Sequence, residues 1–334
     1  MLHFDTLTII AGCFLLSTSL LAAEGPAPKT GRIPVILDTD IGDDIDDTWA
    51  LAVLLKSPEV DLKLVVTDQG KPLYRAKIIA KFLQRAGRTD VAVGLGTPLA
   101  NLPDQGGNQA AWVEGYDLKS YPGKAHADGV QAMIDTIMNS PQPVTVVAIG
   151  PLPTLAAALD RQPEIAKRAR FVGMHGSVRR GYDGAKDPCP EYNVKANAKA
   201  CQKVFTAAWE MTITPLDTCG LVHLRGEKYA KVRDSKDPVA AALIENYRIW
   251  CGKDPQRADK ASSTLFDTVA AYLAFADELL KIESLGIRVT DNGMTAIDPA
   301  AKTLRVATEW KDMAAFEDLL VRRLTGPTAK SLSE

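Results

Sequence analysis

The stretch that indicates most about how this chain folds is Val35-Ile36-Leu37-Asp38-Thr39-Asp40-Ile41-Gly42-Asp43-Asp44-Ile45-Asp46-Asp47. The apolar run that ends at Leu37 predicts a buried β-strand, and the spacing of apolar residues from Thr48 to Leu55 predicts a helix. Between them lies a loop with aspartates at positions 38, 40, 43, 44, 46 and 47. In open α/β sheets, ligands bind beyond the carboxyl ends of the strands, so this loop is a candidate site.

The same alternation of strands and helices continues along the chain. Short apolar runs predict strands over 62–66, 91–93, 143–149, 171–174 and 211–215, and helical spacing predicts helices over 73–86, 130–138, 152–159 and 196–209. Residues 220–280 are expected to be mostly helical, followed by late or edge strands over 287–290 and 304–307 and a helix over 316–324. We therefore predict one α/β domain over 33–326, with a mostly parallel central sheet flanked by helices on both faces and a Rossmann-like core. Residues 327–334 are expected to form a tail.

The overall charge favours a small-molecule ligand. The 334 residues contain 39 basic and 41 acidic side chains, so the net charge of −2 gives no nucleic-acid footprint. Beyond the first segment the cysteines are Cys189, Cys201, Cys219 and Cys251; three pairings are open, as are buried free thiols. None forms a C-x-x-C pair, so we expect neither a zinc nor a redox site. A homo-oligomer is compatible with the sequence.

The first residues are typical of a signal peptide. Residues 7–21 are almost continuously apolar, which is short for a membrane span, and Ala22-Ala23 precede a polar stretch. We predict a signal peptide over 1–23, a flexible leader over 24–32, a secreted or periplasmic mature chain, and no membrane association after cleavage. A lipid anchor at Cys13 is the less favoured alternative.

Crowded carboxylates beyond a buried strand are favourable only with a cation, and oxygen ligands point to Ca²⁺ or Mg²⁺. Asp46 or Asp47 could also cap the following helix. The loop does not match an EF-hand, because Gly42 occupies a ligand position. A Mg²⁺-dependent phosphatase with an aspartate nucleophile is a second interpretation, although Asp267 lacks the acidic partner that such a site needs.

Several stretches together resemble the inosine-uridine-preferring nucleoside hydrolases. They are Asp38–Gly42 with Asp46–Leu51, Val93–Leu99, Ala148–Ala156, Gly173–Gly176, Pro190–Val194 and Phe266–Ala270. The resemblance implies that Ca²⁺ is held by Asp40, Asp47, the carbonyl of Ile149 and Asp267. It also implies that Asp40 is the base for water, that Asp46, Glu191 and Asn193 bind the ribose, and that the nucleoside is cleaved to base and ribose. From the residues alone, a turn at Glu191 and Asn193 and a helix cap at Asp267 remain alternatives.

The chain departs from the family pattern at several positions. The acidic loop carries two extra residues, so Asp43-Asp44 could take the roles of Asp46-Asp47, and Asp44 could reach the metal. Phe266 stands where a leaving-group histidine is usual, which leaves Trp112 or Trp250 as a stacking partner for the base. The missing histidine also leaves open that the protein binds nucleosides or sugars without cleaving them. Lys71 replaces a usual asparagine, and with Arg179 and Arg180 it could serve an anionic substituent.

Overall fold

The computed structural model describes residues 1–2, 31–99 and 106–326. The predicted signal peptide from residue 3 onward, the leader up to residue 30 and the tail 327–334 lie outside the described residues. Within residues 32–326 the chain forms one α/β domain around a single ten-stranded sheet, as predicted.

The strand order places the acidic loop at the middle of the sheet. The order is β4-β3-β2-β1-β5-β6-β7-β10-β8-β9, and all neighbours are parallel except β10 with β8 and β8 with β9. β1 therefore pairs with β2 on one side and β5 on the other. The strands are β1 Ile33–Thr39, β2 Val60–Thr67, β3 Ala92–Gly94, β4 Ala125–His126, β5 Val144–Ala148, β6 Ala169–Met174, β7 Met211–Thr214, β8 Leu280–Val289, β9 Thr295–Ile297 and β10 Thr303–Trp310.

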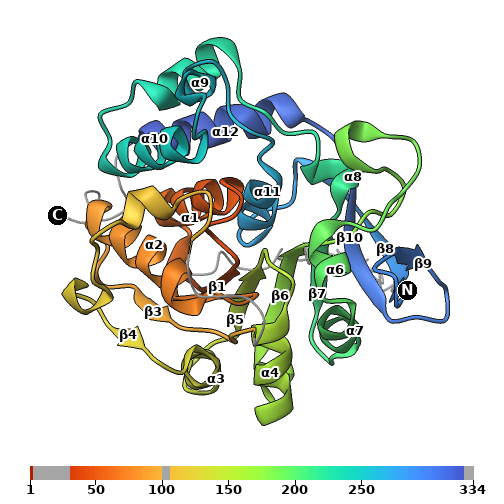
Figure 1. Ribbon diagram of the computed structural model, residues 1–334. Helices are drawn as coiled ribbons and strands as arrows, with labels where there is room; N and C mark the ends of the chain where they lie inside the picture. The colour runs from red at the N-terminus through yellow and green to blue at the C-terminus, as the bar shows by residue number, and fades with distance from the viewer. Residues whose placement is uncertain (3–30, 100–105, 327–334) are drawn as a thin grey trace. The chain divides into compact units, whose positions relative to one another are not determined.

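Helices cover both faces of the sheet (Figure 1). One layer contains α1 Asp46–Lys56, α2 Pro72–Arg85, α9 Gly226–Arg233, α10 Pro238–Trp250, α11 Phe266–Leu273 and α12 Met313–Thr325. The other contains α3 Gly129–Met138, α4 Pro153–Arg161, α5 Ile165–Arg168 and α7 Ala198–Thr206. Shorter helices are α6 Tyr192–Ala196, α8 Leu216–Cys219, η1 Ala110–Val113, η2 Leu118–Ser120, η3 Tyr182–Gly184 and η4 Pro255–Asp259.

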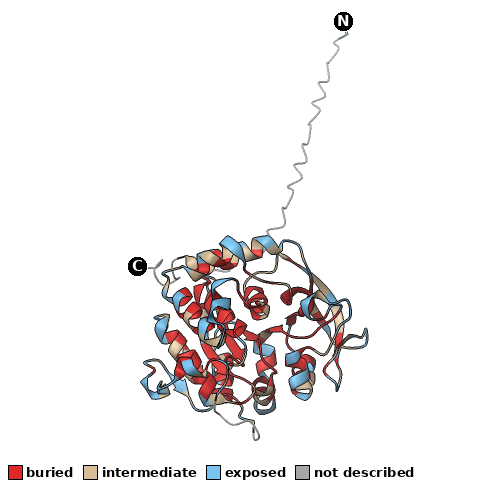
Figure 2. Ribbon diagram, turned by 45° about the horizontal axis from the view of Figure 1, so that its top comes forward, coloured by how far each residue is buried: buried red, intermediate tan, exposed pale blue. Residues whose placement is uncertain are grey.

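Each central strand contributes to two hydrophobic cores, because successive side chains point to opposite faces. In β1, Val35 and Leu37 belong to the core under α1 and α11, whereas Ile36 belongs to the core under α3 and α4. Figure 2 shows the buried strands between helices whose outer surfaces are exposed. Burial on both faces explains why these strands read as continuous apolar runs rather than as alternating patterns.

Four features differ from the sequence-based prediction. The helix predicted over 196–209 is shorter, α7 Ala198–Thr206, because Asn197 lies outside the helical region of backbone angles and its side chain caps α7 at the Ala200 N–H; Ala196 instead ends the separate helix α6. Strand β10 is not at an edge but lies between β7 and β8. β8 begins at Leu280 rather than near Ile287, and the short strands β4 and β9 were not predicted.

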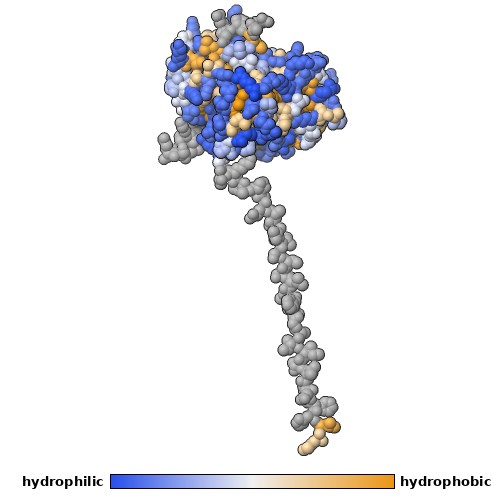
Figure 3. Space-filling view, turned by 90° about the horizontal axis from the view of Figure 1, so that it is seen from below, coloured by the Kyte–Doolittle hydropathy of each residue, from blue (hydrophilic) through white to orange (hydrophobic). Residues whose placement is uncertain are grey.

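The visible surface agrees with a water-exposed domain. The face shown in Figure 3 is mostly hydrophilic, with apolar residues scattered singly or in small groups. Within the described residues, none of the helices combines the length and apolarity that crossing a bilayer requires.

Candidate functional site

A cavity of about 310 Å³ opens where the acidic loop meets the carboxyl ends of β5 and β6. All charged side chains among its described lining residues are carboxylates. The lining residues are Asp40, Asp43, Asp44, Asp46, Asp47, Ile149, Met174, Tyr182, Glu191, Tyr192, Asn193, Phe266 and Asp267. The cavity thus unites Asp40, Asp46, Asp47, Ile149, Glu191, Asn193 and Asp267, which the resemblance had singled out.

Three carboxylates form a compact group at the base of the cavity. Oxygens of Asp46, Asp47 and Asp267 lie within 4.8 Å of one another, and each residue is at most 4% exposed. Asp46 and Asp47 are in the first turn of α1 and Asp267 is in the first turn of α11, and these two helices pack together. Neither Asp46 nor Asp47 caps α1, because the helix begins at Asp46 without a side-chain cap. Instead, Thr39 donates a hydrogen bond to Asp47.

Burial raises the proton affinity of this group. Desolvation, followed by repulsion from neighbouring carboxylates, raises the pKa values of Asp46, Asp47 and Asp267 well above the usual range. Burial also raises the pKa of Asp40 to about 7, although the charge of Arg75 opposes the shift. A divalent cation would offset this repulsion, and hard oxygen ligands in a buried cluster fit such an ion.

The carbonyl of Ile149 lies in a loop that polar side chains hold in place. Asn193 donates from Nδ2 to the carbonyl oxygens of Ile149 and Met174, both at 3.0 Å. His175 donates from Nε2 to the Gly150 carbonyl at 2.9 Å, and burial lowers the pKa of His175 to about 4, so its ring is neutral. These contacts fix the direction of the backbone where β5 ends.

Asp68 holds the far end of the same loop. Its carboxylate accepts hydrogen bonds from the N–H groups of Leu152, at 2.6 Å, and Thr154, at 3.0 Å. Leu152 has a left-handed backbone, with φ of +74°. Asp68 was not singled out from the sequence, because its partners lie 84 and 86 positions away.

Glu191 and Asn193 form the turn that was the alternative to a binding role, and they also line the cavity. Glu191 caps α6: its carboxylate accepts from the N–H groups of Asn193 at 2.7 Å, Val194 at 3.2 Å and Gly176 at 2.9 Å. The expected turn is therefore present, and both side chains also line the cavity. Their ribose-binding role stays a prediction.

One wall of the cavity is aromatic. The rings of Tyr182 and Phe266 meet edge to face with centroids 6.1 Å apart, and the Tyr192 N–H donates to the Tyr182 hydroxyl at 2.9 Å. The sequence did not single out Tyr182 or Tyr192. Tyr192 lies between two predicted site residues, Glu191 and Asn193, and that adjacency was the available signal.

The two tryptophans considered as stacking partners lie elsewhere. Trp112 is 2% exposed, packs against Phe82 and donates from Nε1 to Glu245 at 3.2 Å. Trp250 donates from Nε1 to the Asp43 carbonyl at 3.1 Å and carries Arg257 over its ring. Neither is among the described residues that line the cavity, so a stacking role for them is not supported.

Two of the three basic residues considered for an anionic substituent form ion pairs within the protein. Lys71 forms an ion pair with Asp43 at 2.8 Å, and Arg179 pairs with Glu283 at 2.7 Å. These two residues and Arg180 are absent from the described lining of the cavity. The pairing of Lys71 and Arg179 with carboxylates speaks against a basic mouth, and a role of these residues toward an anionic substituent stays a prediction.

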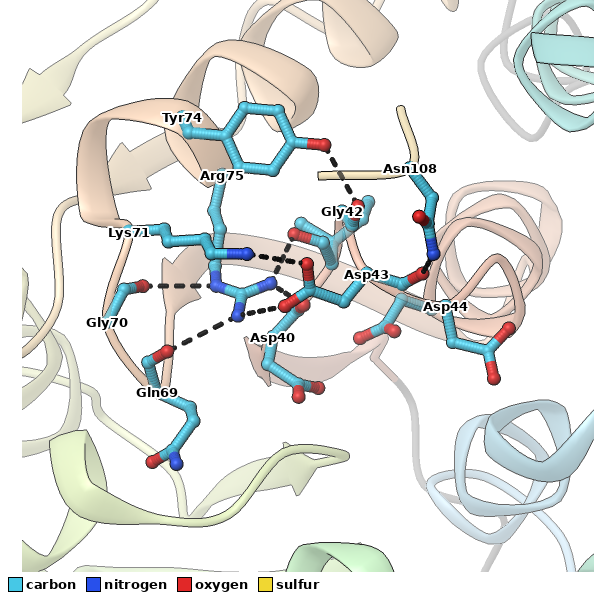
Figure 4. A network of polar contacts seen from close by, with 12 residues as sticks. Asp40, Gly42, Asp43, Asp44, Gln69, Gly70, Lys71, Tyr74, Arg75 and Asn108 are labelled. Atoms are coloured by element: carbon cyan, nitrogen blue, oxygen red, sulfur yellow. Dashed lines mark hydrogen bonds and ion pairs between the residues drawn. The ribbon is translucent and has the colours of Figure 1, made fainter. Parts of the chain in front are cut away.

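Asp43 and Asp44, the alternatives to Asp46 and Asp47, differ in their contacts (Figure 4). Asp43 pairs with Lys71 and with Arg75, the latter at 2.9 Å. Asp44 accepts from the Ile45 N–H at 2.7 Å and lies at the exposed rim. The geometry thus groups Asp46 and Asp47, not Asp43 and Asp44, with Asp267. Which carboxylates bind a metal stays a prediction.

The four cysteines of the domain, Cys189, Cys201, Cys219 and Cys251, are free thiols. Cys201 and Cys219 are buried and the other two are half-buried. The sequence left disulfide pairing and free thiols open, and the structure shows free thiols.

Comparison with known proteins supports one family. The model of the inosine-uridine preferring nucleoside hydrolase family matches residues 35–318. The chain is 32% identical over 228 residues to the non-specific ribonucleoside hydrolase RihC of Klebsiella pneumoniae subsp. pneumoniae, covering 65% of this chain and 73% of that protein. It is 27% identical over 297 residues to the probable uridine nucleosidase 2 of Arabidopsis thaliana, covering 84% and 90%.

Solved structures show the same fold. A plant nucleoside hydrolase superposes with a TM-score of 0.73 at 22% identity, covering 89% of this chain and 100% of the other. A purine-preferring ribonucleoside hydrolase from Gardnerella vaginalis gives a TM-score of 0.71 at 22% identity, covering 88% and 98%. The family match over most of the domain favours glycosidic chemistry over the phosphatase alternative. The chain belongs to the inosine-uridine preferring nucleoside hydrolase family, whose members hydrolyse the N-glycosidic bond of nucleosides.

Proposed function

We propose that this protein hydrolyses the N-glycosidic bond of a ribonucleoside in a Ca²⁺-dependent reaction that uses water and releases base and ribose. The observation that carries the proposal is the buried group of Asp46, Asp47 and Asp267 in a cavity that Asp40 and the Ile149 backbone also line. Asp40, Asp47, Asp267 and the Ile149 carbonyl would hold the ion. Oxygen ligands alone suit Ca²⁺, which accepts irregular geometry and high coordination numbers.

The chain's own residues have distinct roles in the proposed reaction. When bound, the ion supplies Lewis acidity toward water. Asp40, which lines the cavity beside the carboxylate group, accepts a proton from the attacking water as the general base. Asp46, Glu191 and Asn193 orient the ribose hydroxyls, and the surrounding carboxylates stabilise positive charge as the sugar approaches an oxocarbenium-like state.

The substitution Asp40→Asn tests the catalytic role. It removes the base but keeps the size of the side chain, so turnover should fall by at least about a hundredfold while the fold is retained. Release of reducing sugar from inosine, uridine, adenosine, cytidine and guanosine is measured with added Ca²⁺ and with chelator. Circular dichroism and thermal unfolding report on the fold.

Asp291→Asn is the matched control, because Asp291 is exposed and pairs with the surface residues Lys199 and Gln202. It should retain full activity. Undiminished turnover by Asp40→Asn would contradict the role of Asp40. Equal turnover in Ca²⁺ and in chelator would contradict the metal dependence, and an inactive native protein across the panel would contradict the proposed reaction.

We also propose that the chain is exported. The apolar segment 7–21 followed by Ala22-Ala23 supports this proposal. Mass spectrometry of the protein recovered from the producing cells tests it. A mature amino terminus near Glu24 is expected, whereas a lipid-modified Cys13 or an intact Met1 would contradict it.

A further inference from the structure

Arg75 joins the loop after β1 to the loop after β2 (Figure 4). It comes from α2 and its side chain is 1% exposed. The guanidinium donates to the carbonyls of Asp40 and of Ile41, the latter at 2.8 Å, in the loop after β1. It also donates to the carbonyls of Gly70 at 3.0 Å and Gln69 at 3.3 Å, in the loop after β2.

The second of these loops has an unfavourable backbone at two positions. Gln69 and Lys71, on either side of Gly70, both have φ of +48°. Left-handed backbone at residues other than glycine costs of order 1 kcal/mol each and persists only where neighbouring contacts stabilise it. The guanidinium supplies such contacts, since it binds both loops at once.

The contacts of Arg75 leave the Asp40 side chain directed to the cavity. The guanidinium donates to the backbone oxygen of Asp40. The carboxylate that it binds is that of Asp43, at 2.9 Å from Arg75 Nη2. Asp43 is in the part of the loop that is longer than the family pattern. Asp43 also pairs with Lys71, so residues just before and within α2 both hold this part of the loop.

We propose that Arg75 is the positioning residue of the metal site. It fixes the backbone at Asp40, and thereby the Asp40 carboxylate, within a loop that would otherwise be too long to hold one geometry. The proposal rests on the metal site described under the proposed function. Arg75 itself touches neither the ion nor the substrate, and it acts through the backbone of Asp40 and through Asp43.

Metal binding without substrate provides the test. The affinity of the native protein for Ca²⁺ is measured by calorimetry, and its affinity for Tb³⁺ by luminescence excited through the aromatic residues. Arg75→Ala and Arg75→Lys should each bind both ions about 10- to 100-fold more weakly, as is usual when a residue that orients a ligand is lost. Lysine keeps the charge, but one ammonium cannot span the same carbonyls. Ethylguanidinium added to Arg75→Ala should restore part of the affinity.

Arg170 offers a matched control. It is a half-buried arginine that donates to the Ala274 carbonyl and to Thr145 Oγ1, away from the cavity. Arg170→Ala should lower thermal stability without changing the metal affinity. Asp43→Asn removes one partner of Arg75 at a half-exposed position, and it should weaken metal binding even where Arg75→Ala does not fold. With any active substrate, kcat should fall more than KM rises in these variants.

The outcomes separate this proposal from the proposed function. A native protein that binds neither ion would contradict the metal site itself. If the native protein binds Ca²⁺ and both Arg75→Lys and Asp43→Asn bind it equally well, the positioning role is wrong. The role is also wrong if Arg170→Ala weakens binding as much as Arg75→Lys does, since a general loss of stability would then explain the effect.

Discussion

Asp40 is subject to two opposing influences in the metal-free molecule. Burial and the neighbouring carboxylates Asp68 and Asp43 raise its pKa, whereas the charge of Arg75 lowers it, and the net result is a pKa of about 7. Asp46, Asp47 and Asp267 have pKa values that burial moves in the same upward direction. We therefore expect the protonation of these four residues to make both folding stability and metal binding depend on pH.

The stability of the metal-free protein should fall as pH rises. The folded-state pKa of Asp40 is raised from 3.8 to about 7, so between these values the folded chain holds a proton that the unfolded chain has lost. This stabilising contribution is fully present below the unfolded pKa and is lost as pH rises through about 7. A tenfold difference in proton affinity between the folded and unfolded states corresponds to about 1.4 kcal/mol of stability.

Urea unfolding in chelator from pH 5 to pH 8 measures this effect. The free energy of unfolding should decrease across that range, and Asp40→Asn should flatten the decrease. Saturating Ca²⁺ should reverse the trend, because deprotonated carboxylates bind the ion more tightly. A metal-free stability that rises with pH would contradict the assignment.

At the level of single residues, contiguity decided what could be predicted. Asp40, Asp46 and Asp47 lie within eight consecutive residues between the end of β1 and the first turn of α1, so their common location follows from one strand and one helix. Glu191 and Asp267 entered only through the family resemblance. Arg75 and Tyr182 were missed, because their importance depends on contacts with residues distant in sequence, and an arginine or tyrosine in isolation is most often a surface or core residue.

The helix α4 illustrates how an element is fixed by a side chain from another part of the chain. Its N-terminal backbone N–H groups are unsatisfied within the helix, and Asp68 after β2 accepts from two groups at this end, those of Leu152 and Thr154. Asp68 thereby links the end of β2 to the loop that carries the Ile149 carbonyl. Loss of this link should affect both stability and the cavity.

Asp68→Asn should destabilise the protein by about 1–3 kcal/mol and weaken Ca²⁺ binding. Both oxygens of Asp68 accept backbone N–H groups, so an amide NH₂ must face one of these donors and leave it unsatisfied. Urea unfolding and calorimetry measure the two effects.

Asp128→Asn is the control, because Asp128 caps α3 with one oxygen, at the Gln131 N–H, and uses the other for an exposed ion pair with Arg161. Asparagine keeps the capping oxygen, so that variant should remain near native stability and affinity. Equal effects of the two substitutions would refute a special role for Asp68.

Among the elements, strands buried on both faces were predictable and their order was not. The runs at β1, β5 and β6 are continuous because both faces of the sheet are covered. Nothing in the pattern of β10 shows that it inserts between β7 and β8, since that order depends on the connection and not on the strand itself. The helix α6 Tyr192–Ala196 was expected only as a turn, because five residues are too few to show helical spacing of apolar side chains.

For the whole molecule, the distribution of histidines bears on which nucleosides can be cleaved. Within the described residues, His126 is in β4, His175 lies buried beneath Gly150, and His223 bonds to Thr264. None lines the cavity, where Phe266 and Tyr182 form the aromatic wall. Burial raises the pKa of Tyr182, which makes its hydroxyl a weaker proton donor.

A nucleoside whose base leaves without protonation should therefore be the better substrate. 7-Methylguanosine carries a positive charge on the base and releases a neutral molecule, whereas guanosine requires a proton. Because a general acid contributes about 10²- to 10⁴-fold, kcat/KM should favour 7-methylguanosine by at least about a hundredfold.

Steady-state release of reducing sugar from the two compounds measures the ratio. Tyr182→Phe should leave the ratio unchanged. Similar kcat/KM for both compounds in the native protein, together with a selective loss for guanosine in Tyr182→Phe, would identify Tyr182 as the acid and contradict this prediction.

The group formed by Asp46, Asp47 and Asp267 also has a consequence for the lifetime of the folded molecule. Asp47 and Asp267 are 220 positions apart in the chain, and they meet only when α11 docks against α1. Contacts between such distant segments form late in folding, because closing a long loop costs entropy before the contact is made. An ion bound across them would therefore slow unfolding more than it would speed folding, and so would prolong the lifetime of the native state.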